Sequence, residues 1–142
     1  VTIDAIGTQK DIAWLIREQH AHYVLALKDN HPKLYEDVKW LFKHGDSLGW
    51  QDLDHSYAHT FTKAHGREER RECWVLAVAD VEMLDNKAAW RDLQCVVRVR
   101  NTCKRKDVTA QEDRFFITSL PLDASRIMRS VRYHWGIENG LH

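Results

Sequence analysis

The chain has 142 residues, 44% of them hydrophobic and six of them tryptophan, which is enough for about one domain with a real core. No apolar run approaches the roughly 18 residues that span a membrane, and no signal-peptide pattern opens the chain, so we expect a cytoplasmic protein without a membrane partner. Cys73, Cys95 and Cys103 are odd in number and lack CxxC spacing, which favours reduced thiols over a disulfide framework or a zinc site.

The first predicted element is a short strand, Val1–Ile3, which runs directly into Asp4. Thr8 is a candidate N-cap of a helix that continues to about His20. Its core-facing positions, by spacing, are Ile12, Leu15 and Ile16. An acid at the carboxyl end of a strand, just before a helix, lies where α/β folds place functional groups. The alternative is an aspartate that only completes a strand–helix turn.

A second strand and a second helix follow. Tyr23–Leu27 has the apolar pattern of a buried strand. After a turn that ends at Pro32, apolar residues recur at helical spacing. They are Leu34, Val38, Leu41 and Phe42. The stretch Gly45–Gly49 is predicted to be a loop.

From His55 the pattern changes to alternating strands. The predicted strands are Tyr57–Thr62, Glu72–Val78, Cys95–Arg100 and Glu112–Thr118. We therefore expect an α/β fold in which a mixed sheet has flanking helices. Residues at about 1–50 and 111–142 would form its core, and residues at about 51–110 would form a β-rich insertion carried on that core.

The last predicted helix begins near Ser125 and carries a glutamate on an apolar stripe. The stripe consists of Ile127, Val131, Trp135 and Glu138. A carboxylate in such a place must be solvated, paired or bound to a cation, because burying it alone is costly. One interpretation is a partly exposed glutamate paired with an arginine; the other is a cation ligand.

The net charge is zero, but the charges are unevenly distributed. Residues 1–62 carry nine acids and six bases, whereas residues 98–142 carry nine bases and five acids. Bases gather between Arg98 and Lys106 and again at Arg126, Arg129 and Arg132. This distribution suits a protein that holds cations at one place and phosphates nearby. A solvated basic loop beside the outer face of a helix is the alternative.

Five short blocks along the chain carry a family resemblance. They are Thr2-Ile3-Asp4-Ala5, Gln9-Lys10, Tyr23-Val24-Leu25-Ala26-Leu27-Lys28-Asp29-Asn30, His65-Gly66-Arg67 with Glu69 and Arg71, and His134-Trp135-Gly136-Ile137-Glu138-Asn139. In this order they resemble the bacterial insertion-sequence transposases of the H-repeat-associated group. That group belongs to the DDE superfamily, so the resemblance implies DNA transposition and a partial ribonuclease-H-like core.

The resemblance also implies a metal site. Asp4 matches the family's second catalytic aspartate, and Glu138 matches its terminal glutamate. Both would be catalytic residues and metal ligands. Two metal ions clamp the attacking and leaving oxygens of an in-line phosphoryl transfer, and carboxylate oxygens suit Mg²⁺ or Mn²⁺.

DNA is the implied partner, both as transposon ends and as target. The candidate DNA-binding residues are His65, Arg67, Arg71, Lys104, Arg105 and His134. For the arginines near His65, ion pairing with Glu68 and Glu69 is the alternative. His134 stands where related families carry an arginine, so packing beside Trp135 is an alternative to phosphate binding there.

The family's first catalytic aspartate lies upstream of Val1, so we expect this chain to be inactive alone. A core sheet without its upstream strand would expose an edge, which predicts self-association into a homo-oligomer. A function from a different class remains open: a non-catalytic nucleic-acid-binding or interaction module whose acids are only structural. Convergence of Asp4 and Glu138 at one end of the sheet would distinguish the two.

Overall fold

The computed structural model describes residues 2–3, 10–79 and 81–131. Its sheet has six strands in the order β1-β2-β6-β5-β4-β3. The strands are β1 (Thr2–Ile3), β2 (Val24–Leu27), β3 (His55–Ala64), β4 (Arg67–Ala77), β5 (Cys95–Arg105) and β6 (Val108–Thr118). β1 and β2 are parallel, and every other neighbouring pair is antiparallel. The predicted α/β class with a mixed sheet is therefore confirmed.

Helix α1 (Lys10–Glu18) is the connection that makes β1 and β2 parallel, because parallel strands need a crossover. Its buried residue is Ala13, with Ile12 and Ile16 half-buried beside it. Leu15 is 61% exposed, so the prediction that it faces the core is wrong. The stripe that contacts the protein runs through positions 12, 13 and 16, and Leu15 lies outside it.

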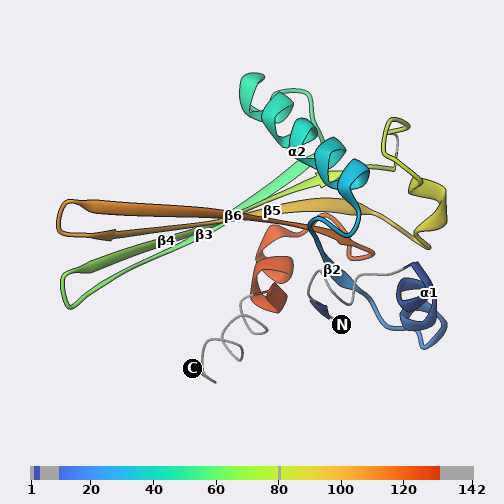
Figure 1. Cartoon of the computed structure of the whole chain (residues 1–142), viewed down its shortest axis with the longest axis horizontal. Coiled ribbons are helices and arrows are strands. Elements are labelled where there is room, and N and C mark those ends of the chain that lie inside the picture. The colour runs from blue at the N-terminus through green and yellow to red at the C-terminus, as the bar shows by residue number, and fades with distance from the viewer. Residues whose placement is uncertain (1, 4–9, 80, 132–142) are drawn as a thin grey trace.

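The sheet has two covered faces, each with its own core. Helix α2 (Pro32–Ser47) lies on one face, which we call the α2 face, and a helix at residues 124–131 lies on the other, which we call the terminal-helix face (Figure 1). The α2-face core includes Phe42 and Phe115. The terminal-helix-face core includes Phe116 and Ile127. Neighbouring residues of β6 thus serve opposite cores, as the alternation of side chains along a strand requires.

Gly45 lies inside α2, so the prediction that residues 45–49 form a loop is wrong at its start. The reason is packing against Trp50, which follows the helix. A Cβ at position 45 would lie only 2.6 Å from the Trp50 ring, so the ring occupies the space that a side chain would need. Glycine, which usually weakens a helix, is required here by the close approach of an aromatic ring.

Two long hairpins project beyond the part of the sheet that the helices cover (Figure 1). β2 ends at Leu27, which pairs with Phe115, whereas β3 to β6 continue past this row. We call residues 58–73 and 99–114 of these hairpins the arm; its innermost row still contributes Cys73 and Val99 to the terminal-helix-face core. It extends for about 24 Å at 3.4 Å per residue. The strands are longer than predicted, because alternation persists through the charged stretches up to the turns at 65–66 and 106–107.

The strands assigned by prediction to an insertion pair directly with β6 in one continuous sheet. The division of the chain into a core and an insertion stays a prediction. Within the described part of the chain, no helix is long and apolar enough to cross a membrane.

Candidate nucleic-acid interface

The predicted site residues fall into two groups. Asp4, His134 and Glu138 lie outside the described residues. The other five lie in the arm or at its turn, in two stretches that are far apart along the chain but adjacent in the sheet. They are His65, Arg67, Arg71, Lys104 and Arg105.

Among residues 2–3, 10–79 and 81–131, no group of three or more His, Cys, Asp or Glu side chains could hold a metal ion. The two predicted metal ligands, Asp4 and Glu138, are not among these residues. The metal site therefore stays a prediction.

The tip of the arm is built from two tight turns side by side. His65 and Gly66 both have positive φ, at 53° and 73°, which lets β3 turn directly into β4. Lys106 also has positive φ in the β5–β6 turn. Because β4 pairs with β5 along its whole length, Arg67 faces Arg105 directly across the two strands.

On the terminal-helix face, the last row of the arm brings two arginines together. Across the four strands this row reads Ala64, Arg67, Arg105 and Val108. A shallow hollow lies over it, lined by these residues together with Thr62, Glu69, Cys103 and Ala110. Two like charges stand next to each other here, with small or apolar neighbours on both sides.

Arg67 and Arg105 differ in their local partners. The Arg67 guanidinium forms an ion pair with Glu69, two residues along the same strand, and this carboxylate raises the pKa of the guanidinium. Arg105 is exposed and, within the described part of the chain, forms no hydrogen bond or ion pair. The internal-pairing alternative, which concerned the arginines near His65, thus holds for Arg67.

The α2 face of the arm also has two basic residues in its last row, but in a different order and with an acid between them. The corresponding row reads Lys63, Glu68, Lys104 and Thr109. The acid lies between the two lysines, and the Lys63 Nζ is 3.7 Å from a Glu68 carboxylate oxygen. The structure therefore separates Lys104 from Arg67 and Arg105, with which the sequence had grouped it.

Arg71 lies on the terminal-helix face, four residues from Arg67 and closer to the body. Its neighbours across the strands are Thr60 and Asn101. It is half-buried and already makes a contact within the protein. Arg71 therefore lies on the same face as the tip arginines but is more enclosed.

At the base of the arm, the basic residues form ion pairs with acids of the protein itself. Arg98 is buried and donates two hydrogen bonds to the Asp46 carboxylate of α2, at 2.7 and 2.9 Å. Arg100 forms a similar pair with Asp113 on β6, at 2.8 and 3.1 Å. The Arg98 guanidinium also lies over the Trp74 ring, 4.0 Å from its centroid. These two arginines hold α2 and the strands together and have little capacity left for a ligand.

The Arg98 contact also governs the protonation of its partner. Hydrogen bonding to Arg98 is the largest influence on Asp46 and lowers the pKa of that carboxyl below its usual 3.8, although partial burial acts in the opposite direction.

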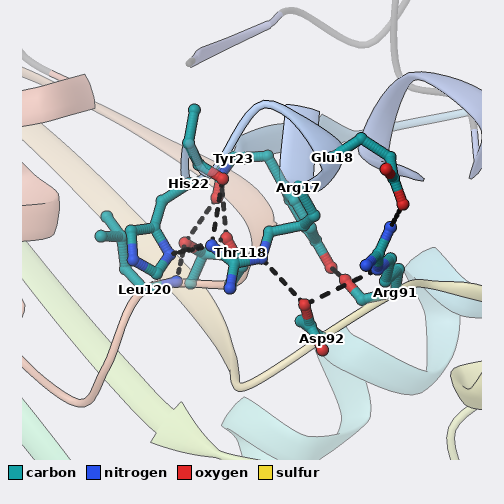
Figure 2. A network of polar contacts seen from close by, with 10 residues as sticks. Arg17, Glu18, His22, Tyr23, Arg91, Asp92, Thr118 and Leu120 are labelled. Carbon is teal, nitrogen blue, oxygen red and sulfur yellow. Dashed lines mark hydrogen bonds and ion pairs between the residues drawn. The ribbon is translucent and has the colours of Figure 1, made fainter. Parts of the chain in front are cut away.

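A second polar cluster lies at the end of the sheet opposite the arm (Figure 2). Arg17 of α1 donates to the Asp92 carboxylate at 2.9 Å and approaches the Nδ1 atom of His22 at 3.2 Å. The Ser119 hydroxyl lies 3.1 Å from the same Nδ1 and accepts a hydrogen bond from the backbone N–H of Tyr23. The cluster joins α1, the start of β2 and the end of β6, so it fixes the crossover helix to the sheet.

The surroundings of His22 in this cluster disfavour its protonated form. Burial lowers its pKa below the usual 6.5, and the positive charges of Arg17 and Arg126 lower it further. A guanidinium can only donate, so the Nδ1 atom of His22 must accept the hydrogen bond from Arg17.

The three cysteines are free thiols, as predicted for a chain without a disulfide framework. Burial raises the pKa of Cys73 to about 12 and that of Cys95 to about 11, so both are unreactive. Cys103 is half-buried and lines the hollow at the arm tip.

Sequence reasoning missed the structural context of the tip residues. It named Arg67 and Arg105 but gave no reason to place them opposite each other. It also missed Glu69 as the partner that Arg67 takes, and Cys103 as a lining residue of the hollow. The strand register carries this information, and a sequence pattern would reveal it only if both turns were located to the residue.

The chain is similar over its whole length to several curated proteins. It is 32% identical across 152 residues to "Putative transposase YncI" of Escherichia coli O157:H7. It is 36% identical across 146 residues to "H repeat-associated putative transposase YhhI" and, equally, to "Putative protein YbfL", both of Escherichia coli strain K12. The matches cover 36–38% of these relatives, so the chain spans little more than a third of their length. No family model and no solved structure matches the chain.

Proposed function

Because the chain belongs, over its whole length, to the H repeat-associated transposase group, we propose that it forms part of the catalytic core of a DDE transposase. The reaction would be metal-dependent cleavage and transfer of DNA strands at transposon ends. Since the chain spans little more than a third of its relatives, the activity of a whole transposase is part of this proposal.

The observation that carries the proposal is the β1–α1–β2 unit. Thr2–Ile3 pairs in parallel with β2, and Asp4 follows β1 directly in the sequence. In α/β sheets, ligands bind outside the carboxyl ends of parallel strands. An aspartate in this sequence position is suited to hold a cation at that end, as a ribonuclease-H-like core would require.

The helix at residues 124–131 supports the same arrangement. Its buried residues include Ile127 and Val131, which pack on the terminal-helix face of the sheet. Glu138 is seven residues beyond Val131, which is two helical turns along the same predicted stripe. If the helix continues with the same periodicity, the glutamate would face the sheet side.

The proposed donor set suits a hard divalent ion. Asp4 and Glu138 would offer carboxylate oxygens, which are the ligands that Mg²⁺ and Mn²⁺ prefer. Bound ions would stabilise the charge that develops on the oxygens of an in-line phosphoryl transfer. Two carboxylates are too few for a two-metal site, so a further aspartate upstream of Val1, as in DDE transposases, belongs to the proposal.

The test is a chimera in which this sequence replaces the matching region of the H repeat-associated relative. We expect Mg²⁺-dependent nicking of DNA that carries the ends of that relative's element. Asp4→Ala and Glu138→Ala should each abolish nicking, because each removes a proposed metal ligand. The 142-residue chain alone should not nick DNA.

Asp11→Ala and Glu36→Ala serve as matched controls, since both carboxylates are exposed or half-exposed on helices and should be dispensable. Nicking that survives Asp4→Ala or Glu138→Ala would contradict the proposal. A chimera that binds DNA but never cleaves it would favour the alternative, a non-catalytic nucleic-acid-binding module, which the paired arginines at the arm tip suit equally well.

A further inference from the structure

We propose that the arm binds the phosphate backbone of duplex DNA through one face only, the terminal-helix face, with Arg67 and Arg105 as the phosphate-binding pair. This inference rests on the proposed function for the identity of the nucleic acid. It goes further by assigning the contact to one of the two faces of the arm, each of which carries two basic residues in its last row.

The strand register distinguishes the faces. In the last row of the α2 face, Glu68 stands between Lys63 and Lys104, so an acid separates the two positive charges. In the last row of the terminal-helix face, Arg67 and Arg105 are direct neighbours, and Glu69, the acid that pairs with Arg67, lies one row further in. Like charges directly opposite each other across two strands are unfavourable unless an anion lies over both. The terminal-helix face thus places two guanidinium groups where a single anion could contact both, whereas on the α2 face an acid lies between the two bases.

The shape of the tip favours the same face. The hollow of the arm lies over the row of Arg67 and Arg105, and small side chains, Thr62, Ala64 and Ala110, keep it open. A phosphate group could approach both guanidinium groups there. Arginine suits this contact, because its planar group presents several N–H donors to phosphate oxygens.

The terminal-helix face also continues toward the proposed catalytic end of the molecule. The helix at residues 124–131 packs on it and exposes Arg126 and Arg129. Within β4, Cys73 is the core residue nearest the arm tip beneath that helix. Arg67 lies six residues closer to the tip. The separation is about 20 Å at 3.4 Å per residue. This corresponds to about six base pairs along a duplex, so one DNA molecule could contact the arm tip and the helix side together.

The experiment measures the affinity of the 142-residue chain for a labelled 30-base-pair duplex over a range of salt concentrations. The tested variant is Arg67→Gln/Arg105→Gln. Its matched control is Lys63→Gln/Lys104→Gln, which removes the same charge from the next row on the opposite face. Loss of two phosphate contacts should make the slope of log K against log salt shallower by about 1.8. The control variant should keep the wild-type slope.

Several outcomes would overturn the inference: equal flattening by both variants, flattening by the control alone, no change in either, or no binding of the duplex by the wild-type chain. Folding should not obscure the result. The variant relieves the repulsion of two adjacent like charges and loses only the exposed Arg67–Glu69 ion pair, so its melting temperature should stay close to the wild-type value.

Cys103 offers a second measurement that needs no change to the arginines. It lines the hollow, and the other two thiols are buried and unreactive. Duplex DNA should slow alkylation of Cys103 by iodoacetamide. In the control, Thr102→Cys/Cys103→Ser moves the thiol to the adjacent residue of β5, whose side chain points to the α2 face. DNA should leave alkylation of that thiol unchanged; equal protection of both thiols would contradict the one-face assignment.

These results are separable from a failure of the proposed function. Loss of the arm contact with Mg²⁺-dependent nicking retained in the chimera would overturn only the face assignment. A normal arm contact without nicking would overturn only the catalytic proposal.

Discussion

Two arginines on the same strand, Arg98 and Arg105, show how position in this fold determines what a basic residue does. Arg98 lies at the base of the arm, with a side chain only 4% exposed and two hydrogen bonds to Asp46. Arg105 lies seven residues away at the tip, exposed and without an ion pair in the described part of the chain. The first is beneath α2, and the second lies beyond the helices that the structure describes.

The difference teaches that the basic late half of the chain is not one surface. Near the helices, Arg98 and Arg100 pair with acids, because an unpaired charge there would be costly. Beyond them, water solvates charges, and positive residues can remain available for a partner. Net charge alone conceals this division.

The largest expected effect comes from breaking the pair at the arm base. Asp46→Ala would leave the buried Arg98 guanidinium without its carboxylate partner. The free energy of unfolding should fall by about 3 kcal/mol. Thermal or urea denaturation measures it.

The tip supplies the control for that experiment. Glu69→Ala removes the partner of Arg67, but both side chains there are accessible to water. The cost should stay below about 1 kcal/mol, as for other surface ion pairs. Similar losses for Asp46→Ala and Glu69→Ala would mean that the base and the tip do not differ as described.

A smaller contrast is expected between two glycines. Gly45→Ala would force a methyl group against the Trp50 ring, which packs on α2. This change should cost about 1–3 kcal/mol. Gly66 has φ of +73° with open space around its Cα, so Gly66→Ala meets only backbone strain. That strain should cost about 1 kcal/mol. If Gly66→Ala proved the more destabilising of the two, packing of Trp50 would not be what fixes Gly45.

The smallest expected effect is a pH dependence of stability caused by His22, which lies at the end of the sheet opposite the arm. Its folded-state pKa is below the usual 6.5, so the unfolded chain binds more protons in the window between those two values. Stability should therefore be complete above pH 6.5 and should decline as the pH falls through this window. Denaturation curves at several pH values would show it.

His22→Gln should remove this decline, whereas His59→Gln on the exposed arm strand should leave it in place. A decline that persists unchanged in His22→Gln would show that another group is responsible. The carboxyl of Asp46 titrates below 3.8, so its contribution lies in a separate, more acidic window.

Much of the fold could be predicted because it depends on local periodicity. The run from Tyr23 to Leu27 is apolar on both sides and forms the buried strand β2, and Leu34, Val38, Leu41 and Phe42 form the buried side of α2. Gly45 was misassigned because the sequence does not show that Trp50 folds back onto it. Leu15 was misassigned because α1 is only partly covered, so an apolar residue at plausible spacing remains exposed.

The site was less predictable for a different physical reason. Arg67 and Arg105 are 38 positions apart, and only the register of β4 with β5 brings them together. Lys104 adjoins Arg105 in the sequence, yet its side chain points to the opposite face. Charge clustering can select such residues, but assigning them to a face requires the strand pairing.

Because the arm side chains alternate between faces, the arm also constrains how its own length can change. Deleting one residue from β4 and one from β5 between the base and the tip would keep these two strands paired. It would move the side chains of Arg67 and Arg105 to the opposite face of the sheet. The terminal-helix face of the tip would then carry the side chains that now lie on the α2 face. A change of two residues in each strand would preserve the faces. Insertions and deletions that retain the pairing of Arg67 with Arg105 on this side should therefore come in even numbers per strand, matched across all four strands.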